Sequence, residues 1–256
     1  MSLQQAIEKV NKAGKTAFIP YVMAGDGQLS NLPSTIVRLQ NLGATAIEVG
    51  IPFSDPVADG PIIEEAGNRA LANGTTLKKV LQMLAQEQEQ ITIPIIMMTY
   101  LNPVIAYGSE KFAVDAKAAG VSAVIIPDMP YEERDTVYPA LQNANINLIQ
   151  LVSLTSTKDR KQLLTSASEG FVYAVTVNGI TGSRQEFDTK LAEHFAELKQ
   201  LSPVPVIAGF GISSREHIEL FSTFCDGVIV GSKIVQSLHE NDWDSIEQLL
   251  ASPHVV

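Results

Sequence analysis

Short apolar runs alternate with segments of helical spacing along the whole chain. The runs are rich in β-branched residues and have the length of buried parallel strands. Eight strands are predicted, over Ala17–Val22, Ala46–Val49, Pro94–Thr99, Ala123–Ile126, Asn147–Leu151, Phe171–Val175, Val204–Ala208 and Gly227–Val230. Apolar residues three and four positions apart predict helices over Pro33–Leu42, Leu77–Glu87, Ser109–Ala119, Glu132–Asn143, Lys158–Ala167, Leu191–Leu201, Ser214–Phe221 and Ile234–Leu238.

This alternation predicts an α/β fold of the (β/α)₈ TIM-barrel type. Eight strand–helix pairs within 256 residues is the repeat of such a barrel. A doubly wound open sheet also alternates, but it usually has fewer strands at this length, and no GxGxxG motif follows the first strand. No linker or low-complexity stretch divides the chain. We therefore expect residues 1–256 to form a single barrel domain with a short N-terminal helix inside Met1–Lys15.

Charge and cysteine content restrict the partners and the compartment. The formal net charge is −10, so the chain has no surplus of basic residues with which to bind nucleic acid or an anionic membrane. Cys225 is the only cysteine, which excludes an intrachain disulfide. The most apolar segment, Ile91–Leu101, is too short to cross a bilayer, and the N-terminus does not resemble a secretory signal. A cytoplasmic protein is expected.

A barrel fold also predicts where chemistry takes place. Active sites of such barrels lie at the C-terminal ends of the strands, in the loops that lead to the helices. The polar and small residues just past the predicted strands should therefore converge on one pocket. They are Asp26, Glu48, Asp59, Tyr100, Asn102, Asp128, Ser153, Tyr173, Thr176, Gly209, Gly211, Gly231 and Ser232.

Glu48 and Asp59 are the strongest candidates for acid/base groups. Glu48 lies in the apolar strand, and alternation places it with Ala46, on the opposite side from Ile47 and Val49. The apolar side suits the helices, so Glu48 should face the barrel interior. Burying an unpaired carboxylate is costly, which favours a functional role, although a structural carboxylate held by a neighbouring donor is the alternative. Asp59 lies on the loop beyond, where acidic residues also serve as turn or capping residues.

Three glycine-containing loops favour a phosphate site. Gly209-Phe210-Gly211-Ile212-Ser213-Ser214 follows the seventh strand, and Gly231-Ser232 follows the eighth. Barrels often bind phosphate there, through exposed backbone N–H groups and the N-terminus of a short helix. The segment Asn178-Gly179-Ile180-Thr181-Gly182 can add donors after the sixth strand. A single glycine pair is ordinary loop punctuation, but three such loops on adjacent strands point to an anion.

Other catalytic groups are poorly placed. All four histidines fall in predicted helices or in the C-terminal tail, which argues against a metal site. No lysine lies inside a predicted strand, where burial would prepare it to form a Schiff base. We therefore expect carboxylates, together with Tyr173, to carry the chemistry, with no metal ion and no cofactor on this chain.

The loop from Glu48 to Pro61 resembles the signature of the tryptophan synthase α-chain family. Its sequence is Glu-Val-Gly-Ile-Pro-Phe-Ser-Asp-Pro-Val-Ala-Asp-Gly-Pro. The segments Ile126–Pro130, Gly179–Gly182, Gly209–Ser213 and Gly231–Ser232 match the same family in the same order, so the resemblance covers nearly the whole length. It implies a (β/α)₈ lyase of L-tryptophan biosynthesis that splits indole-3-glycerol phosphate into indole and glyceraldehyde 3-phosphate.

The resemblance also implies partners and residue roles. It implies an α₂β₂ complex in which the β chain carries pyridoxal phosphate and receives indole through a tunnel. Carried over by motif position, the catalytic residues are Glu48, Asp59 and Tyr173, and the phosphate-binding residues are Gly182, Gly211, Gly231 and Ser232. The residues of the indole pocket are Tyr21, Ile63, Tyr100, Ile126 and Thr181, and the Pro52–Asp59 loop, including Asp55, would face the β chain.

The chain departs from the family at two positions, and two alternatives stay open. Val177 stands where some members have arginine, within the polar segment Val177–Thr189 that we expect to be a long loop and a candidate lid. Tyr21 replaces a phenylalanine that is common in the family. One alternative is a stand-alone indole-3-glycerol phosphate lyase with the same catalytic residues. The other is a barrel that binds a phosphorylated ligand and regulates a partner.

Overall fold

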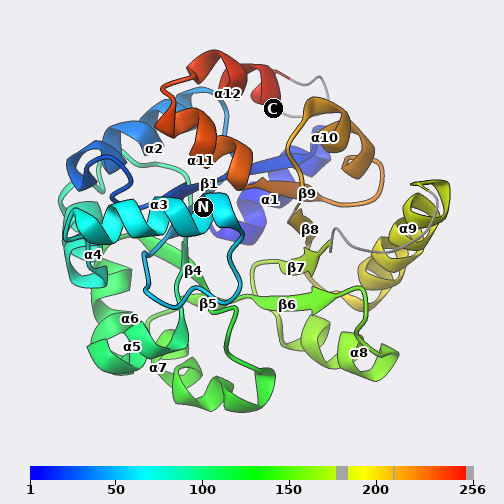
Figure 1. Ribbon diagram of the computed structural model, residues 1–256. Helices are drawn as coiled ribbons and strands as arrows, with labels where there is room; N and C mark the ends of the chain where they lie inside the picture. Colours follow the sequence, from blue (N-terminus) through cyan, green and yellow to red (C-terminus); the bar gives the residue numbers. More distant parts are fainter. Residues whose placement is uncertain (177–183, 210, 252–256) are drawn as a thin grey trace.

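A parallel β-barrel surrounded by helices forms the centre of the molecule (Figure 1). The computed structural model describes residues 1–176, 184–209 and 211–251. Within these residues, every strand pairing is parallel. The strands are β1 (Ala17–Met23), β2 (Ile47–Gly50), β3 (Ile95–Met98), β4 (Val121–Ile125), β5 (Asn147–Leu148), β6 (Gln150–Ser153), β7 (Val172–Val175), β8 (Val206–Gly209) and β9 (Gly227–Val230).

The barrel closes at Ile149. The strands follow the order β5-β4-β3-β2-β1-β9-β8-β7-β6, so β5 and β6 stand at the two ends of the sheet. Only Ile149 separates these two strands along the chain, and its N–H donates to the carbonyl of Val124 on β4 at 3.1 Å. The fifth predicted strand, Asn147–Leu151, is therefore one strand that pairs with β4 in its first half and with β7 in its second. The predicted (β/α)₈ barrel is confirmed.

Helices follow the strands around the barrel. They are α1 (Leu3–Lys12), α2 (Leu32–Asn41), α3 (Pro61–Ala72), α4 (Leu77–Gln86), α5 (Leu101–Tyr107), α6 (Ser109–Ala118), α7 (Tyr138–Asn143), α8 (Lys158–Ala167), α9 (Arg184–Leu201), α10 (Arg215–Phe221), α11 (Ser232–His239) and α12 (Trp243–Leu250), with 3₁₀ turns at Leu29–Asn31 and Tyr131–Thr136. The predicted helices do not include α3, α5 and α12.

Two predicted boundaries were wrong. The predicted helix Glu132–Asn143 is a 3₁₀ turn followed by α7, with a break at Val137. Pro139 lies in the first turn of α7 and has no N–H, so it cannot sit in the interior of one continuous helix. The expected long loop Val177–Thr189 is shorter than expected, because α9 begins at Arg184. Residues 177–183 lie outside the described part of the chain.

Strand alternation divides the core into two layers. Ile47 and Val49 belong to the layer between the barrel and the helices, as does Phe18 of β1. Ala46 belongs to the layer inside the barrel, together with Ile19 of β1. Glu48 shares the inward side with Ala46, as the sequence predicted.

Helix α1 closes the end of the barrel opposite the site. Leu3 and Ile7 are fully buried and pack with Ala17 and Phe171 in the inner layer. A capping box at Ser2 starts this helix, and Asn11 donates to the backbone carbonyl of Asp226 at 2.7 Å. Since the N-terminal mouth is covered in this way, a ligand must enter from the C-terminal ends of the strands.

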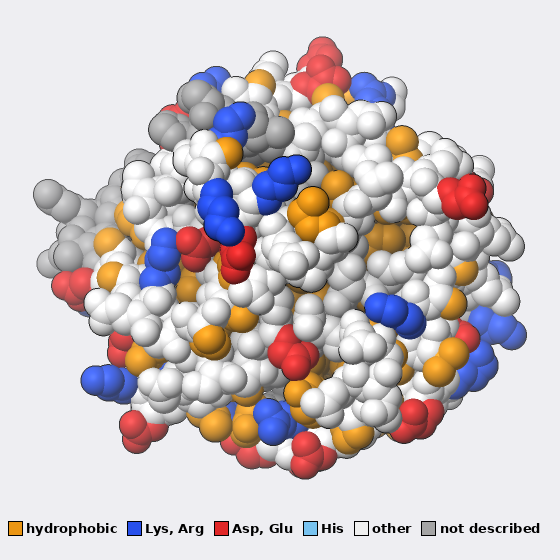
Figure 2. Space-filling model, turned by 180° about the vertical axis from the view of Figure 1, so that it is seen from behind, with side chains coloured by type: hydrophobic (Ala, Val, Ile, Leu, Met, Phe, Trp, Pro, Cys, Tyr) orange, Lys and Arg blue, Asp and Glu red, His pale blue; other side chains and the backbone are white. Residues whose placement is uncertain are grey.

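The outer surface carries charges of both signs. On the described part of the face in Figure 2, lysine and arginine side chains lie among aspartate and glutamate side chains, without a large area of one sign. Among the described residues, no helix is both long and apolar enough to cross a membrane.

His194 on α9 is a buried histidine outside the barrel. Its side chain is 4% exposed, and neither ring nitrogen has a hydrogen-bond partner among the described residues. Lys161 of α8, which pairs with Glu197 at 2.5 Å, is a charged neighbour of the ring. Burial, together with the Lys161 charge, lowers the pKa of His194 from 6.5 to about 4.

This histidine makes stability depend on pH. The unfolded chain binds a proton at His194 more readily than the folded chain does. The free energy of unfolding is therefore highest above pH ~6.5 and falls as the pH drops towards ~4, by at most roughly 3 kcal/mol. His194→Leu removes this titration, so the variant should gain stability relative to the parent between pH 7.5 and pH 4.5. Urea unfolding of both proteins at the two pH values measures the difference. A stability difference that does not change with pH would contradict the prediction.

Candidate active site

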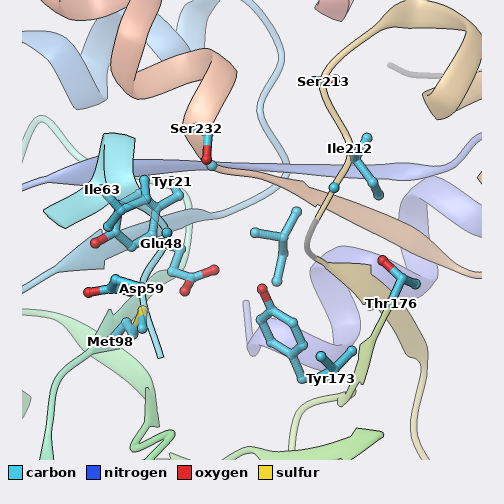
Figure 3. Close-up of a pocket in the computed structure, with 15 residues that line it drawn as sticks. Tyr21, Glu48, Asp59, Ile63, Met98, Tyr173, Thr176, Ile212, Ser213 and Ser232 are labelled. Atoms are coloured by element: carbon cyan, nitrogen blue, oxygen red, sulfur yellow. The ribbon is translucent and has the colours of Figure 1, made fainter. Parts of the chain in front are cut away.

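A cavity of about 480 Å³ opens at the C-terminal end of the barrel (Figure 3). Its walls combine acidic, aromatic, aliphatic and glycine residues from both halves of the chain. The residues that line it are Tyr21, Glu48, Asp59, Gly60, Ile63, Met98, Tyr173, Val175, Thr176, Gly211, Ile212, Ser213, Ile229, Gly231 and Ser232. Seven of the polar and small residues expected past the strands are in this set.

Strand β2 positions Glu48 in the wall of the cavity. Its backbone pairs with Tyr21 of β1 and Ile96 of β3, both in the middle of the sheet. The side chain is 2% exposed, and Oε2 has no hydrogen-bond partner in the described part of the chain. Burial, followed by the nearby charge of Asp59, raises the pKa of Glu48 to about 8. The carboxyl group therefore keeps its proton at neutral pH and can act as an acid.

Asp59 stands at the end of the loop that follows β2, directly before α3. Burial raises its pKa to about 6, while a hydrogen bond from the Tyr100 hydroxyl acts in the opposite direction. The same hydroxyl accepts from the N–H of Ala58 at 3.1 Å, so Tyr100 holds the end of the loop. At neutral pH Asp59 is mainly ionised and Glu48 mainly protonated, which gives one base and one acid in one cavity.

Two tyrosines reach the cavity only because neighbouring strands end in glycine. A Cβ on Gly50 would lie 1.8 Å from the Tyr21 hydroxyl, and a Cβ on Gly209 would lie 2.3 Å from the Tyr173 ring. Burial raises the pKa of Tyr21 and of Tyr173 well above the usual value, so both remain neutral. Figure 3 shows Glu48 and Tyr173 pointing into the cavity from different strands.

Small residues after β8 and β9 form a further part of the wall. Gly231 precedes α11, and Ser232 is the first residue of that helix, so helical N–H groups begin at the cavity. Gly211 has a φ of +74°, a left-handed conformation that favours glycine, and Ser213 follows it on the same wall. This wall has the backbone features of an anion site. The predicted residues Thr181 and Gly182 lie outside the described residues, as does Val177.

Other predicted residues lie elsewhere. Ile126 belongs to the layer between the barrel and the helices and lines a separate cavity, because Ile125 is the inward residue of β4. Tyr100 is not among the residues of the cavity wall. Its ring stacks on Phe53 of the loop that follows β2, with ring centroids 5.2 Å apart. Of the two expected interface residues, Asp55 is exposed and Pro52 is buried.

Four further polar residues that were expected at the cavity do not line it, and one of them, Asn102 in α5, is exposed. Asp128 accepts from the N–H of Leu101 at 2.9 Å, at the start of α5. Ser153 interacts with Thr155 inside its own loop. Asp26 forms an ion pair with Arg69 of α3. The polar groups of the other three are therefore used to shape loops next to the site.

The residues that sequence reasoning missed are mostly apolar. Met98, Val175, Ile212 and Ile229 line the cavity without a distinctive motif. A partial signal exists for Met98, because it follows Ile96 by two positions and thus shares the inward face of β3. Among the described residues, no group of histidine, cysteine, aspartate and glutamate side chains could hold a metal ion.

Comparison with known proteins agrees with this geometry. The model of the family described as "Tryptophan synthase alpha chain" matches residues 7–254. A tryptophan synthase alpha chain of Bacillus cereus is 50% identical over 247 residues, which is 95% of this chain and 96% of the relative.

This chain belongs to the tryptophan synthase alpha chain family. It is therefore a lyase that cleaves indole-3-glycerol phosphate in tryptophan biosynthesis, and its partner is a β chain. In this family the alpha chain needs no cofactor, and pyridoxal phosphate is on the β chain.

Solved structures support the same assignment. Mycobacterium tuberculosis tryptophan synthase has a chain with a TM-score of 0.89 and 31% identity, and the match covers 99% of this chain and 98% of that one. The tryptophan synthase subunit alpha of Campylobacter jejuni has a TM-score of 0.84 and 32% identity, with 93% and 95% covered.

Proposed function

We propose that Glu48 and Asp59 carry out the cleavage of indole-3-glycerol phosphate by acid/base catalysis, with Glu48 at indole C3 and Asp59 at the indole N1–H. The observation that carries this proposal is the pair of unlike carboxyl groups in one cavity. The pKa of Glu48 is about 8 and that of Asp59 about 6, so near pH 7 the first holds a proton and the second can accept one.

The proposed steps balance without a cofactor. Glu48 donates its proton to indole C3, while Asp59 stabilises or accepts the N1 proton as positive charge develops on the ring. The bond between C3 and the adjacent glycerol carbon then breaks, its electron pair returns to the indole ring, and any proton that Asp59 accepted goes back to N1. The hydroxyl oxygen on that glycerol carbon becomes the aldehyde oxygen, and its proton passes to the Glu48 carboxylate. Indole and glyceraldehyde 3-phosphate are formed, and both carboxyl groups return to their starting states.

The remaining groups orient the substrate. Tyr21 and Ile63 lie beside the two acids and provide an apolar wall for the indole ring (Figure 3). The hydroxyl of Tyr173 lies on the side facing Glu48, where it can bind the glycerol chain or the developing aldehyde. The phosphate would take the wall of Gly211, Gly231 and Ser232, with Gly182 and Thr181 as further groups in the proposed set.

The two pKa values predict a bell-shaped activity profile. The specificity constant kcat/KM should fall below pH ~6, because Asp59 gains a proton, and above pH ~8, because Glu48 loses one. Glu48→Gln should lower kcat by roughly 10²–10⁴-fold, and Asp59→Asn should remove the acidic limb of the profile. Release of indole measured from pH 5 to pH 9 tests both statements. Activity of Glu48→Gln within about threefold of the parent would remove Glu48 from the mechanism.

Gly231→Ala tests the phosphate wall with little risk to the fold. A Cβ at Gly231 would lie 3.8 Å from Ile63 and 3.9 Å from Tyr21, which is ordinary contact distance, and the backbone there has a negative φ. The methyl group should nevertheless hinder close approach of an anion, so binding of glycerol phosphate should weaken by about tenfold or more. Binding of indole should change much less. Equal losses for both ligands in calorimetry would mean that the phosphate lies elsewhere.

We further propose that residues 1–256 act as one domain in an α₂β₂ complex in the cytoplasm. Reducing conditions suit the unpaired, buried Cys225. The Pro52–Asp59 loop supports a contact with the β chain, because it leads directly to Asp59 and exposes Asp55 and Val57, the latter at 81%. A β chain that orders this loop would hold Asp59 in place without adding a catalytic group of its own.

Asp55→Ala therefore separates activation from catalysis. The β chain should accelerate the parent chain by at least about tenfold, and the variant should lose more of this activation than of its isolated rate. Light scattering of the mixture gives the stoichiometry, for which we expect two copies of each chain. An isolated chain that is as fast as the mixture would instead indicate a stand-alone lyase.

A further inference from the structure

Asp26 lies outside the cavity, at a point where two helices of the site end. Its side chain is 10% exposed and accepts two hydrogen bonds from Arg69, from Nε to Oδ1 at 2.6 Å and from Nη2 to Oδ2 at 2.9 Å. Nδ1 of His239 is 3.9 Å from the same Oδ1. Two-point contact between a guanidinium and a largely buried carboxylate is among the strongest and most directional of side-chain interactions.

The two helices that meet at Asp26 both begin at the cavity. Helix α3 follows Asp59 and Gly60, and Arg69 lies in its last turn. Helix α11 begins with Ser232 and ends with His239. The two helices pack against each other, as Figure 1 shows in cyan and orange. Their N-terminal ends thus carry groups of the proposed active site, while their C-terminal ends both lie next to the Asp26 carboxylate.

Further contacts fasten the loop of Asp26 to the end of α3. Nδ2 of Asn73, the residue after α3, donates to the carbonyl of Gly27 at 2.7 Å. A Cβ on Gly25 would lie 2.0 Å from Oγ1 of Thr75, so the loop is pressed against this residue. The loop after β1 is therefore a fixed support for the far end of α3.

We propose that Asp26 and Arg69 are positioning residues for the lyase reaction, because they fix the helix that carries Asp59 at its N-terminal end. The inference rests on the proposed catalytic role of Asp59. Nδ1 of His239 is beyond hydrogen-bond distance of this carboxylate, so the contact that fixes α3 is the one with Arg69.

The distance along α3 between Arg69 and Asp59 makes such support important. Arg69 lies eight positions after Pro61, the first residue of α3, which is roughly 12 Å at about 1.5 Å per residue, so a tilt of about 5° about Arg69 moves the Asp59 end by about 1 Å. A misplacement of about 1 Å can cost on the order of 10²-fold in rate. The Tyr100 hydroxyl restrains the loop on the near side of Asp59, and Arg69 restrains the far end of the helix that follows it.

The test is a double-mutant cycle in the complex with the β chain. Arg69→Met should lower kcat by about tenfold or more, with KM for indole-3-glycerol phosphate within about threefold of the parent. In an Asp59→Asn background, the same change should lower kcat by less than about twofold, because the group that Arg69 positions is already gone. Arg69→Lys keeps the charge but loses the two-point contact, so its kcat should be intermediate. Asp26→Asn keeps the shape of the side chain and provides a second variant if Arg69→Met folds poorly.

A matched control is available on the other side of the barrel. Arg160 also makes a two-point contact with a carboxylate, that of Glu132, and its side chain is 33% exposed, as is that of Arg69. Arg160→Met should leave kcat unchanged, while thermal unfolding of both variants reports any general loss of stability.

Three results would overturn the inference. A loss of kcat from Arg69→Met that is the same in both backgrounds would mean that Arg69 does not act through Asp59, as would unchanged kcat in the parent background. If Asp59→Asn itself leaves kcat unchanged, the proposed role of Asp59 fails and the inference fails with it. A large loss in Asp59→Asn together with normal turnover in Arg69→Met overturns the inference alone.

Discussion

The two-residue alternation of a closed parallel barrel determines which side chains reach the site. Apart from one register shift between β3 and β4 at Ile95 and Ile96, neighbouring strands pair residue by residue, so a residue that faces inward on one strand meets inward residues of both neighbours. Glu48 is paired with Tyr21 and Ile96, and Tyr173 with Leu151 and Ile207. A shift of one residue in β2 would exchange Glu48 for an apolar neighbour and place the carboxylate between the barrel and the helices. The chemistry thus depends on the register that closure at Ile149 maintains.

Burial of the Glu48 carboxyl group costs folding free energy but suits the acid/base role proposed for it. An unpaired buried carboxyl group weakens the folded state, because it must either keep its proton or lose its hydration. Glu48 keeps the proton, as its raised pKa of about 8 indicates, and that state is the one an acid catalyst requires. The apolar layer around it, with Ile19 and Ile96 fully buried, compensates through its own burial. The protonated state that burial imposes on Glu48 is thus the state that its proposed catalytic role requires.

Support for the site extends well beyond its walls. Gly50 and Gly209 provide the space for two tyrosine rings, and the hydroxyl of Tyr100 holds the end of the Asp59 loop. The contact of Asp26 with Arg69 acts at a greater distance, at the far end of α3. Apart from the two tyrosines, none of these residues belongs to the cavity wall. A ligand that enters the cavity therefore meets groups whose positions are already set by packing and hydrogen bonds.

The sequence by itself determined the parts of the protein that depend on local pattern. The order of strands and helices, the inward side of Glu48 and the glycine-containing loops follow from the spacing of residues within short segments, because a strand repeats every two residues and a helix every 3.6. Only the tertiary structure decided how distant segments meet. It placed Ile126 outside the barrel, moved Tyr100 from the pocket wall to the support of a loop, and joined Asp26 to Arg69, 43 positions away. It also decided the pKa values of Glu48 and Asp59. Burial and distance between charges are properties of the folded chain as a whole, and local spacing carries no information about either.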